Sequence, residues 1–237
     1  ANRSRFLAEL IDFGTIPSIS TDPTAKADIQ RAAQWVADQL TRLDARNVQI
    51  FQTTGHPVVY GEMLAAGPQA PTVLVYGHYD VQPVDPINLW ETSPFSPDIR
   101  GDNIYARGIT DMKGQVMASL KAVESVLHAG PLPVNLKFMI EGEEEIGSPS
   151  LVPFMESHKE MLACDFALNP DTGILAPDVP TITYALRGLA YFELRVFGPD
   201  HDLHSGVFGG SVLNPAQALC ELIAGMHDDQ GRVTLPG

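Results

Sequence analysis

Histidine and carboxylate side chains occur at four places in this chain, each where a strand-like run of residues gives way to a loop or turn. In chain order they are His78 with Asp80, then Asp111, then Glu144 with Glu145, and finally Asp171. In α/β proteins, strand ends present catalytic groups to a crevice. Imidazole and carboxylate groups are also the ligands that catalytic zinc accepts. These residues therefore predict a hydrolase site that holds two metal ions.

The segment around His78 has two interpretations. His78 follows the apolar run 73–76, and Asp80 comes two residues later, on the same side of an extended chain. A metal-ligating imidazole normally donates its other N–H to a carboxylate, which fixes the tautomer, and Asp80 is placed to accept it. The same pattern is also typical of a turn histidine beside a solvated aspartate.

The remaining carboxylates have structural alternatives as well. Asp111 precedes a helical run, where aspartate is a favoured N-cap, although a carboxylate there can also bridge two cations. Four glutamates lie within residues 141–145 and repel one another unless cations or solvent neutralise them. They indicate either a solvated acidic loop or adjacent glutamates with separate tasks, one taking a proton from water and one binding a metal. Asp171 follows Pro170, and Pro-Asp is a strong turn signal.

Helices and strands alternate in the segments that must position these residues. Apolar residues at helical spacing predict helices at 5–13, 25–43, 113–127 and 149–158. Shorter apolar runs predict strands at 48–51, 58–63, 73–76, 134–140 and 166–168. The proline-rich stretch 83–97 must be a loop. This order predicts an α/β fold with a mostly parallel sheet flanked by helices.

A second domain is expected to begin near residue 187, after a first domain at 1–186. Residues 191–197 alternate like a strand, and Asn214 followed by Pro215 predicts the start of a helix that runs to about residue 226. One strand and one helix cannot bury an independent core. We therefore expect residues 187–237 to be the truncated beginning of an α+β domain.

Composition excludes some classes of partner. The chain of 237 residues carries 29 acidic and 15 basic side chains, a net charge of −14, which argues against binding nucleic acid or an anionic membrane. Its apolar runs fall far short of the roughly 20 residues that a membrane span needs. No signal-peptide pattern opens the sequence, so a cytoplasmic protein is expected. Cys164 and Cys220 lie far apart and predict buried thiols rather than a disulfide.

Four segments, in order and in a match that covers essentially the whole chain, resemble the di-zinc exopeptidase family that includes carnosinase, aminoacylase, succinyl-diaminopimelate desuccinylase and carboxypeptidase G. The segments are GHYDVQPV at 77–84, RGITDMKG at 107–114, EGEEEIGS at 141–148 and DLHSGVFGG at 202–210. The last segment is more similar to the dipeptidase and carnosinase branch than to the desuccinylases. The resemblance implies the zinc exopeptidase fold, in which residues 187–237 begin an inserted lid and dimerisation domain.

The resemblance also implies how the metal ions are held. His78 and Asp171 would bind one zinc ion, Glu145 would bind the second, and Asp111 would bridge both. Manganese or cobalt would also suit so many carboxylates. As in relatives, the peptide bond after Asp111 would be cis. A last histidine ligand, and an arginine that grips the substrate carboxylate, are expected from chain beyond residue 237.

The implied reaction is hydrolysis of the amide bond in dipeptides or short peptides. Glu144 would be the general base, taking a proton from a water activated by the two zinc ions, while Asp80 orients His78. Glu143 is left out of the site because relatives often carry an apolar or small residue there. His204 would reach the site of the partner in a homodimer and stabilise the oxyanion. Alone, it is also typical of a surface histidine beside flexible glycines.

Two alternatives to a dipeptidase stay open. An N-acyl amino acid deacylase or desuccinylase of the same family would use the same metals and the same base on a different substrate. A catalytically silent, truncated homologue would instead act as a dimerising module. Turnover of a substrate panel separates the first alternative, and the metal content of the purified protein separates the second.

Overall fold

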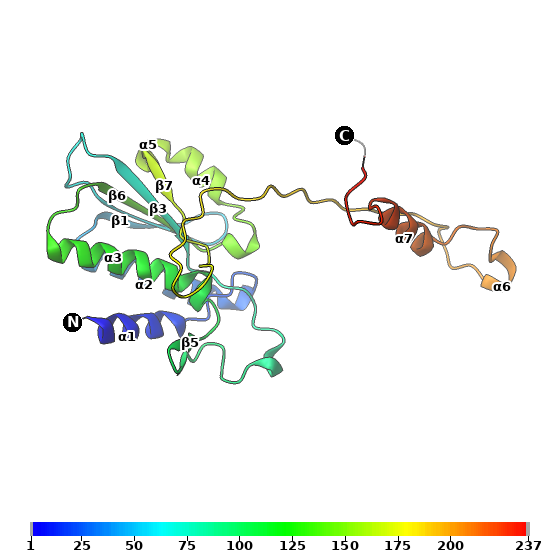
Figure 1. Ribbon diagram of the computed structural model, residues 1–237, viewed down its shortest axis with the longest axis horizontal. Coiled ribbons are helices and arrows are strands. Elements are labelled where there is room, and N and C mark those ends of the chain that lie inside the picture. The colour runs from blue at the N-terminus through cyan, green and yellow to red at the C-terminus, as the bar shows by residue number, and fades with distance from the viewer. Residues whose placement is uncertain (1, 236–237) are drawn as a thin grey trace. The chain divides into compact units, whose positions relative to one another are not determined.

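The computed structural model describes residues 2–235 of the chain (Figure 1). Contacts divide the chain into two units, of which the first ends at Thr181 and the second begins at Ile182. The assignment of residues 187–237 to a lid domain stays a prediction.

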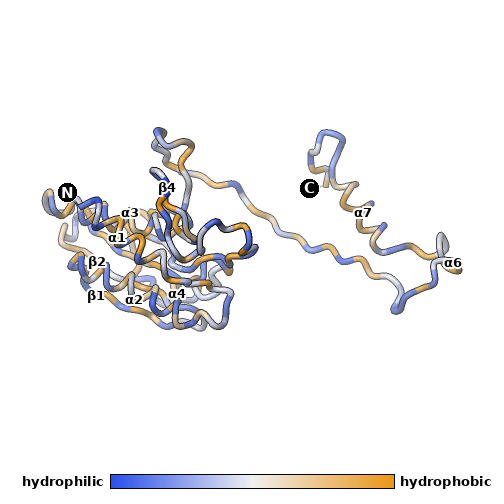
Figure 2. Tube along the Cα trace, turned by 90° about the horizontal axis from the view of Figure 1, so that it is seen from below, coloured by the Kyte–Doolittle hydropathy of each residue, from blue (hydrophilic) through white to orange (hydrophobic). Residues whose placement is uncertain are grey.

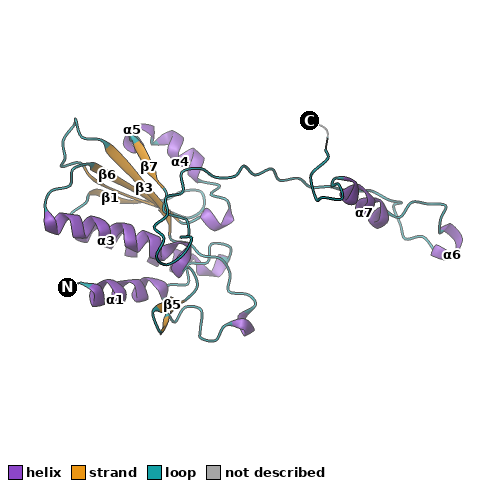
Figure 3. Ribbon diagram, in the orientation of Figure 1, coloured by secondary structure: helices purple, strands orange, loops and turns teal. Residues whose placement is uncertain are grey.

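The first unit is built on a five-stranded sheet with the strand order β1-β2-β6-β3-β7 (Figure 3). Its strands are β1 (Arg46–Phe51), β2 (Val58–Met63), β3 (Thr72–His78), β6 (Asn135–Glu141) and β7 (Phe166–Leu168). Strand β3 pairs in parallel with both β6 and β7, whereas β2 is antiparallel to β1 and β6. This arrangement confirms the predicted α/β fold with a mostly parallel sheet. A separate hairpin joins β4 (Asp98–Arg100) to β5 (Asn103–Tyr105), which the sequence analysis did not predict.

Helices cover both faces of this sheet. They are α1 (Arg3–Gly14), α2 (Lys26–Arg42), α3 (Gly114–Ala129), α4 (Leu151–Ser157) and α5 (Lys159–Leu162). The larger apolar core, which includes Phe13, Val36 and Leu120, lies between α1, α2, α3 and one face of the sheet. A smaller core around Met139 and Phe154 lies on the opposite face, beneath α4 and α5. All of the predicted helices and strands of the first unit are therefore confirmed.

Strand β6 lies at the centre of the sheet, and all seven of its residues are buried. Because successive side chains of a strand point to opposite faces, Phe138 and Ile140 enter the larger core while Met139 enters the smaller one. A strand buried on both faces is confined in direction and register. The loop that leaves β6 therefore starts from a fixed point.

Between residues 182 and 235, the second unit contains two helices, α6 (Ser205–Phe208) and α7 (Pro215–Gly225). Asn214 caps α7 as predicted, because its side-chain oxygen accepts hydrogen bonds from the backbone N–H groups of Ala216 and Gln217. The strand predicted at 191–197 is wrong for the described residues, which are not in a strand there. A strand needs a neighbour for its backbone N–H and C=O groups, and the side chain of Tyr191 remains 89% exposed.

The predicted burial of the two cysteines is also wrong. Both thiols are exposed and unpaired. Cys164 precedes β7, an edge strand with exposed residues, and Cys220 lies on α7, none of whose described residues is buried. Among residues 2–235, no helix is long and apolar enough to cross a membrane. Accordingly, Figure 2 shows hydrophobic and hydrophilic residues interleaved along the trace.

Candidate metal centre

The ends of three parallel strands bring His78, the acidic segment 141–145 and Asp171 together. His78 is the last residue of β3 and pairs in register with Glu141, the last residue of β6. On the other side of β3, Leu168 of β7 pairs with Val75. Three further residues carry the chain from Leu168 to Asp171, which brings Asp171 level with His78. The carboxyl ends of parallel strands open at one edge of a sheet, so these segments deliver their side chains to one place.

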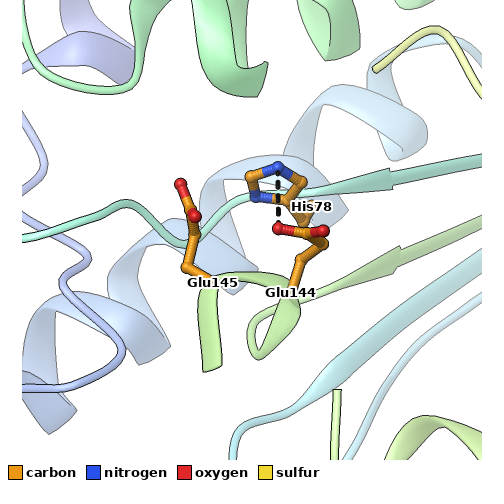
Figure 4. A group of neighbouring side chains, drawn as sticks. All are labelled: His78, Glu144 and Glu145. Carbon is orange, nitrogen blue, oxygen red and sulfur yellow. Dashed lines mark ion pairs between the residues drawn. The ribbon is translucent and has the colours of Figure 1, made fainter. Parts of the chain in front are cut away.

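The imidazole of His78 is fully buried and lies among carboxylates. Its Nε2 atom is 3.2 Å from Oδ1 of Asp111, 3.6 Å from Oδ2 of Asp171 and 3.8 Å from Oε2 of Glu144. Figure 4 shows Glu144 and Glu145 rising from one loop, with their carboxylates beside the ring. Oxygen atoms from three separate chain segments therefore converge on one nitrogen.

Two groups of these side chains have the spacing of metal ligands. One group is His78, Asp111 and Asp171, and the other is His78, Glu144 and Glu145. Within each group, the potential ligand atoms all lie within 4.8 Å of one another. The first group contains the three residues predicted around one ion, and their role as ligands stays a prediction. The second group includes Glu144, which was predicted to be the general base and not a metal ligand.

Asp80 joins the histidine to the acidic loop. Its buried carboxylate lies 3.3 Å from Nδ1 of His78, and its backbone oxygen is 3.0 Å from the same atom. The two carboxylate oxygens also accept hydrogen bonds from the backbone N–H groups of Glu144, at 3.2 Å, and Glu145, at 3.1 Å. One side chain therefore positions three predicted site residues. The alternative of a turn histidine beside a solvated aspartate is wrong.

The other two glutamates of the acidic run, Glu141 and Glu143, hold the loop in place through hydrogen bonds. Glu143 accepts hydrogen bonds from the backbone N–H groups of His56, at 2.9 Å, and Ser150, at 3.0 Å. Glu141 accepts from the hydroxyls of Tyr76, at 2.6 Å, and Ser148, at 2.8 Å. Because both glutamates are almost completely buried, the alternative of a solvated acidic loop is wrong.

At two glycines, Gly55 and Gly142, another side chain packs so close to the backbone that no Cβ atom would fit. A Cβ atom on Gly55 would lie 1.5 Å from Oε1 of Glu143, which is fixed by its two backbone partners. A Cβ atom on Gly142 would lie 2.4 Å from the hydroxyl oxygen of Tyr79, whose ring is fully buried. Only hydrogen fits at either position without moving a neighbour.

Asp111 lies in an irregular turn before α3, and its side chain is 61% exposed. The N-cap of α3 is Lys113, so the alternative of Asp111 as the helix cap is wrong. The peptide bond between Asp111 and Met112 is cis, as expected. The buried ammonium group of Lys113 donates to the carbonyl oxygens of Phe13, at 3.2 Å, and Ile16, at 2.6 Å, which ties this turn to the end of α1.

The charges of the site favour a bound cation. Burial lowers the pKa of His78, but the hydrogen bond and charge of Asp80, with two further carboxylates nearby, outweigh it and raise the pKa to about 9. Burial is the main cause of the raised pKa values of Glu144, Glu145 and Asp171. Repulsion between the neighbouring carboxylates adds to these rises, so a divalent cation that replaces the proton of His78 would favour their charged forms. The residues fit a metal.

The family model described as Peptidase family M20/M25/M40 matches residues 74–227, which include every predicted site residue. The chain belongs to this family. Cys-Gly metallodipeptidase dug1 of Schizosaccharomyces pombe is 34% identical over 248 residues, which cover 99% of this chain and 52% of the relative. Beta-Ala-His dipeptidase of Homo sapiens is 34% identical over 250 residues, which cover 100% of this chain and 49% of the relative.

A solved structure gives the same result for the M20/M25/M40 family. The M20 family metallo-carboxypeptidase Sso-CP2 from Sulfolobus solfataricus is 35% identical in sequence, and its structure superposes with a TM-score of 0.76. The superposition covers 98% of this chain and 52% of the Sulfolobus chain. The predicted similarity to the dipeptidase and carnosinase branch is confirmed by the named dipeptidases. The chain spans about half the length of these relatives.

His204 lies in the second unit, at the N-cap of α6. Its Nδ1 atom accepts a hydrogen bond from the backbone N–H of Gly206 at 3.0 Å. An Nδ1 atom that accepts carries no proton, so in the neutral ring the proton is on Nε2. The predicted role of His204 at a partner's site stays a prediction.

Proposed function

We propose that this chain carries the larger part of a metal-dependent dipeptidase site, which hydrolyses the amide bond of dipeptides or short peptides. The observation that carries the proposal is the approach of Asp111, Asp171 and Glu144 to Nε2 of His78, within 3.2–3.8 Å. The relatives named as dipeptidases, one of them a metallodipeptidase, support the same reaction class.

In this proposal, His78 and Asp171 would hold one cation, Glu145 would hold a second, and Asp111 would be a ligand of both. An imidazole ligand favours zinc, while manganese or cobalt also suits a site with this many carboxylates. Such ions, when bound, polarise the substrate carbonyl and lower the pKa of water. Burial is the main cause of the raised pKa of Glu145, and Coulombic repulsion from Asp111 adds to it. This repulsion supports the proposal that Asp111 and Glu145 lie around the same cation.

Glu144 is the proposed general base. Asp80 fixes its backbone through the hydrogen bond to its N–H group, so its carboxylate projects from a fixed point. Burial raises its pKa, which brings a carboxylate closer to the pH at which a base works best. Glu144 takes a proton from the attacking water and returns it to the leaving amine.

His204 is the proposed oxyanion donor. The Nε2–H group of its neutral ring would donate a hydrogen bond to the substrate oxygen as negative charge develops there. We place this histidine at the site of the partner subunit in a homodimer formed through the domain that includes residues 187–237. A cytoplasmic location belongs to the same proposal.

Substrate turnover tests the proposed function. The full-length protein, depleted of metal and then reloaded with zinc, is offered Cys-Gly, β-Ala-His, a tripeptide, and N-acetyl and N-succinyl amino acids. We expect release of amino acids from the dipeptides, loss of activity on chelation and recovery with zinc. Faster turnover of the N-acyl substrates would indicate a deacylase. Preference for the tripeptide would indicate a carboxypeptidase, the activity named for the Sulfolobus relative.

A further inference from the structure

The side chain of Gln82 contacts the acidic loop in a way that the reaction above does not use. Its Nε2 group donates a hydrogen bond of 2.7 Å to Oε2 of Glu145. The same nitrogen lies 3.3 Å from the backbone oxygen of Glu145. One of the two carboxylate oxygens of Glu145 is therefore engaged by an amide, while no such bond is recorded for Oε1 in the described structure.

The backbone that carries Gln82 is held firmly. The preceding residue, Val81, is fully buried and donates its N–H to the backbone oxygen of Ser18 at 2.9 Å. Val81 also forms a parallel bridge with Ile19, and the hydroxyl of Ser18 donates to the backbone oxygen of Tyr79 at 2.6 Å. These contacts fix the turn after β3, so Gln82 reaches the loop from a rigid base.

Asp80 and Gln82 act on the same residue from two positions of this turn. Asp80 accepts from the backbone N–H of Glu145, and Gln82 contacts both its backbone oxygen and its carboxylate. Glu145 is thus fixed at its N–H, its C=O and one side-chain oxygen. A carboxylate held in this way has one oxygen directed by the protein and one left for a cation.

We propose that Gln82 is a positioning residue that presents Glu145 to a divalent cation through the single oxygen Oε1. This inference rests on the proposed metal site. Zinc sites use few ligands at closely defined positions, whereas larger cations such as calcium accept carboxylates through both oxygens. By engaging Oε2, Gln82 disfavours the two-oxygen mode and keeps the coordination number low.

The test compares Gln82→Met, which keeps the length of the side chain but removes the donor, with wild-type full-length protein. Gln52→Met is the matched control, because Gln52 is exposed and, within residues 2–235, its side chain forms a hydrogen bond only with Gln30. Zinc affinity for each of two ions is measured by competition with a chelator. The visible spectrum of the cobalt-loaded protein reports the coordination number, since its bands weaken as that number rises.

We expect Gln82→Met to bind one of the two zinc ions about 10–100-fold more weakly, the range typical for loss of a partner behind a metal ligand. The other ion should be bound as in wild type, the cobalt bands should weaken, and Gln52→Met should match wild type throughout. Gln82→Asn keeps a donor on a shorter side chain, so its zinc affinity should lie between those of Gln82→Met and wild type.

Unchanged affinities and an unchanged cobalt spectrum in Gln82→Met overturn this inference but leave the proposed function intact. Equal weakening of both ions also overturns it, because that result indicates general loosening rather than an effect on Glu145. If wild-type protein binds fewer than two ions, the proposed function itself fails. The outcomes therefore distinguish failure of the inference from failure of the site.

Discussion

At the scale of single residues, Asp80 shows how one buried carboxylate can position both a histidine and a loop. It is buried, lies beside the imidazole of His78, and accepts hydrogen bonds from the backbone N–H groups of Glu144 and Glu145. A buried carboxylate is costly unless hydrogen bonds satisfy it, and these donors do so. Its position therefore depends on the same loop that it holds in place.

Glu144 provides the first prediction. Changing Glu144 to Gln keeps the shape of the side chain but removes its ability to carry a proton, so kcat should fall by about 10²–10⁴-fold, as is usual for loss of a general base. Both metal ions should remain bound, as measured by elemental analysis of the full-length variant. If the variant keeps more than about a tenth of the wild-type kcat, well short of that range, Glu144 is not the base.

Asp111 provides the second prediction. An amide lacks the charge and the second anionic oxygen that a bridge between dications needs, so Asp111→Asn should lower metal affinity and activity together. Calorimetric titration with zinc measures the first and dipeptide turnover the second. Two ions held as tightly as in wild type would show that Asp111 does not bridge them.

The residue scale also shows what the sequence could and could not predict. His78, Asp111 and Asp171 could be grouped because each follows or precedes an element whose period is visible in the sequence. The hydrogen bond of Gln82 was not predicted, although its spacing of two from Asp80 was a usable signal. The roles of Glu141 and Glu143 depend on loops folded behind the site, and no local pattern specifies them.

At the scale of elements, a network of charged side chains joins three helices on one face of the sheet. Lys121 of α3 contacts Glu9 of α1 at 2.5 Å and Glu124 at 3.1 Å, and it donates to Gln39 of α2 at 3.0 Å. Arg5 of α1 pairs with both glutamates. The network fixes the position of α1. The end of this helix also accepts a hydrogen bond from the buried ammonium group of Lys113, through the backbone oxygen of Phe13.

This network provides the third prediction, for acid stability. The hydrogen bond from Arg5 is the main cause of the lowered pKa of Glu124, and Lys121 adds to it. Partial burial opposes the ionisation of Glu9, but Lys121 and Arg5 outweigh it and lower that pKa also. Lowered carboxyl pKa values add stability above the ordinary glutamate pKa, and this stability is lost as pH falls through the lower folded values.

The measurement is the urea midpoint of unfolding between about pH 6 and about pH 3, a window that spans the ordinary glutamate pKa and lower values. Wild type should lose more stability across this window than Glu124→Gln, whose remaining partners no longer titrate in the same way. Both proteins need the same metal content. Parallel curves for the two proteins would contradict the assignment of acid sensitivity to this network.

Strand direction marks the limit of prediction at this scale. Apolar periodicity predicted where β1 and β2 lie, but their antiparallel pairing follows from the short connection between them, which cannot make a parallel crossover. The segment 191–197 carries the period of a strand but has no partner within the described residues. Period specifies which side chains share a face, whereas pairing depends on residues far away in the sequence.

At the scale of the whole molecule, the fourth prediction concerns the proposed homodimer. Full-length His204→Ala and Glu144→Gln should each be inactive alone. Mixed under conditions that exchange subunits, equal amounts should give about half mixed dimers, each with one site that has both an intact base and an intact donated histidine. Activity should therefore return on mixing.

Mass spectrometry of the mixture provides the control for subunit exchange. If mixed dimers form and no activity returns, His204 does not act in the partner subunit. A monomeric full-length protein in sedimentation experiments would remove the dimer proposal altogether. Two copies of Glu144→Gln, exchanged in the same way, should stay inactive.

The close approach at Gly55 and Gly142 bears on how inherited or laboratory variants of this protein are interpreted. Neither glycine carries a functional group, yet a methyl group at Gly142 would meet the buried ring of Tyr79, and one at Gly55 would meet Glu143. Either change would require the acidic loop or the residue packed against it to move. A missense variant at these positions should therefore be classed with variants of the proposed metal centre, not with neutral loop changes.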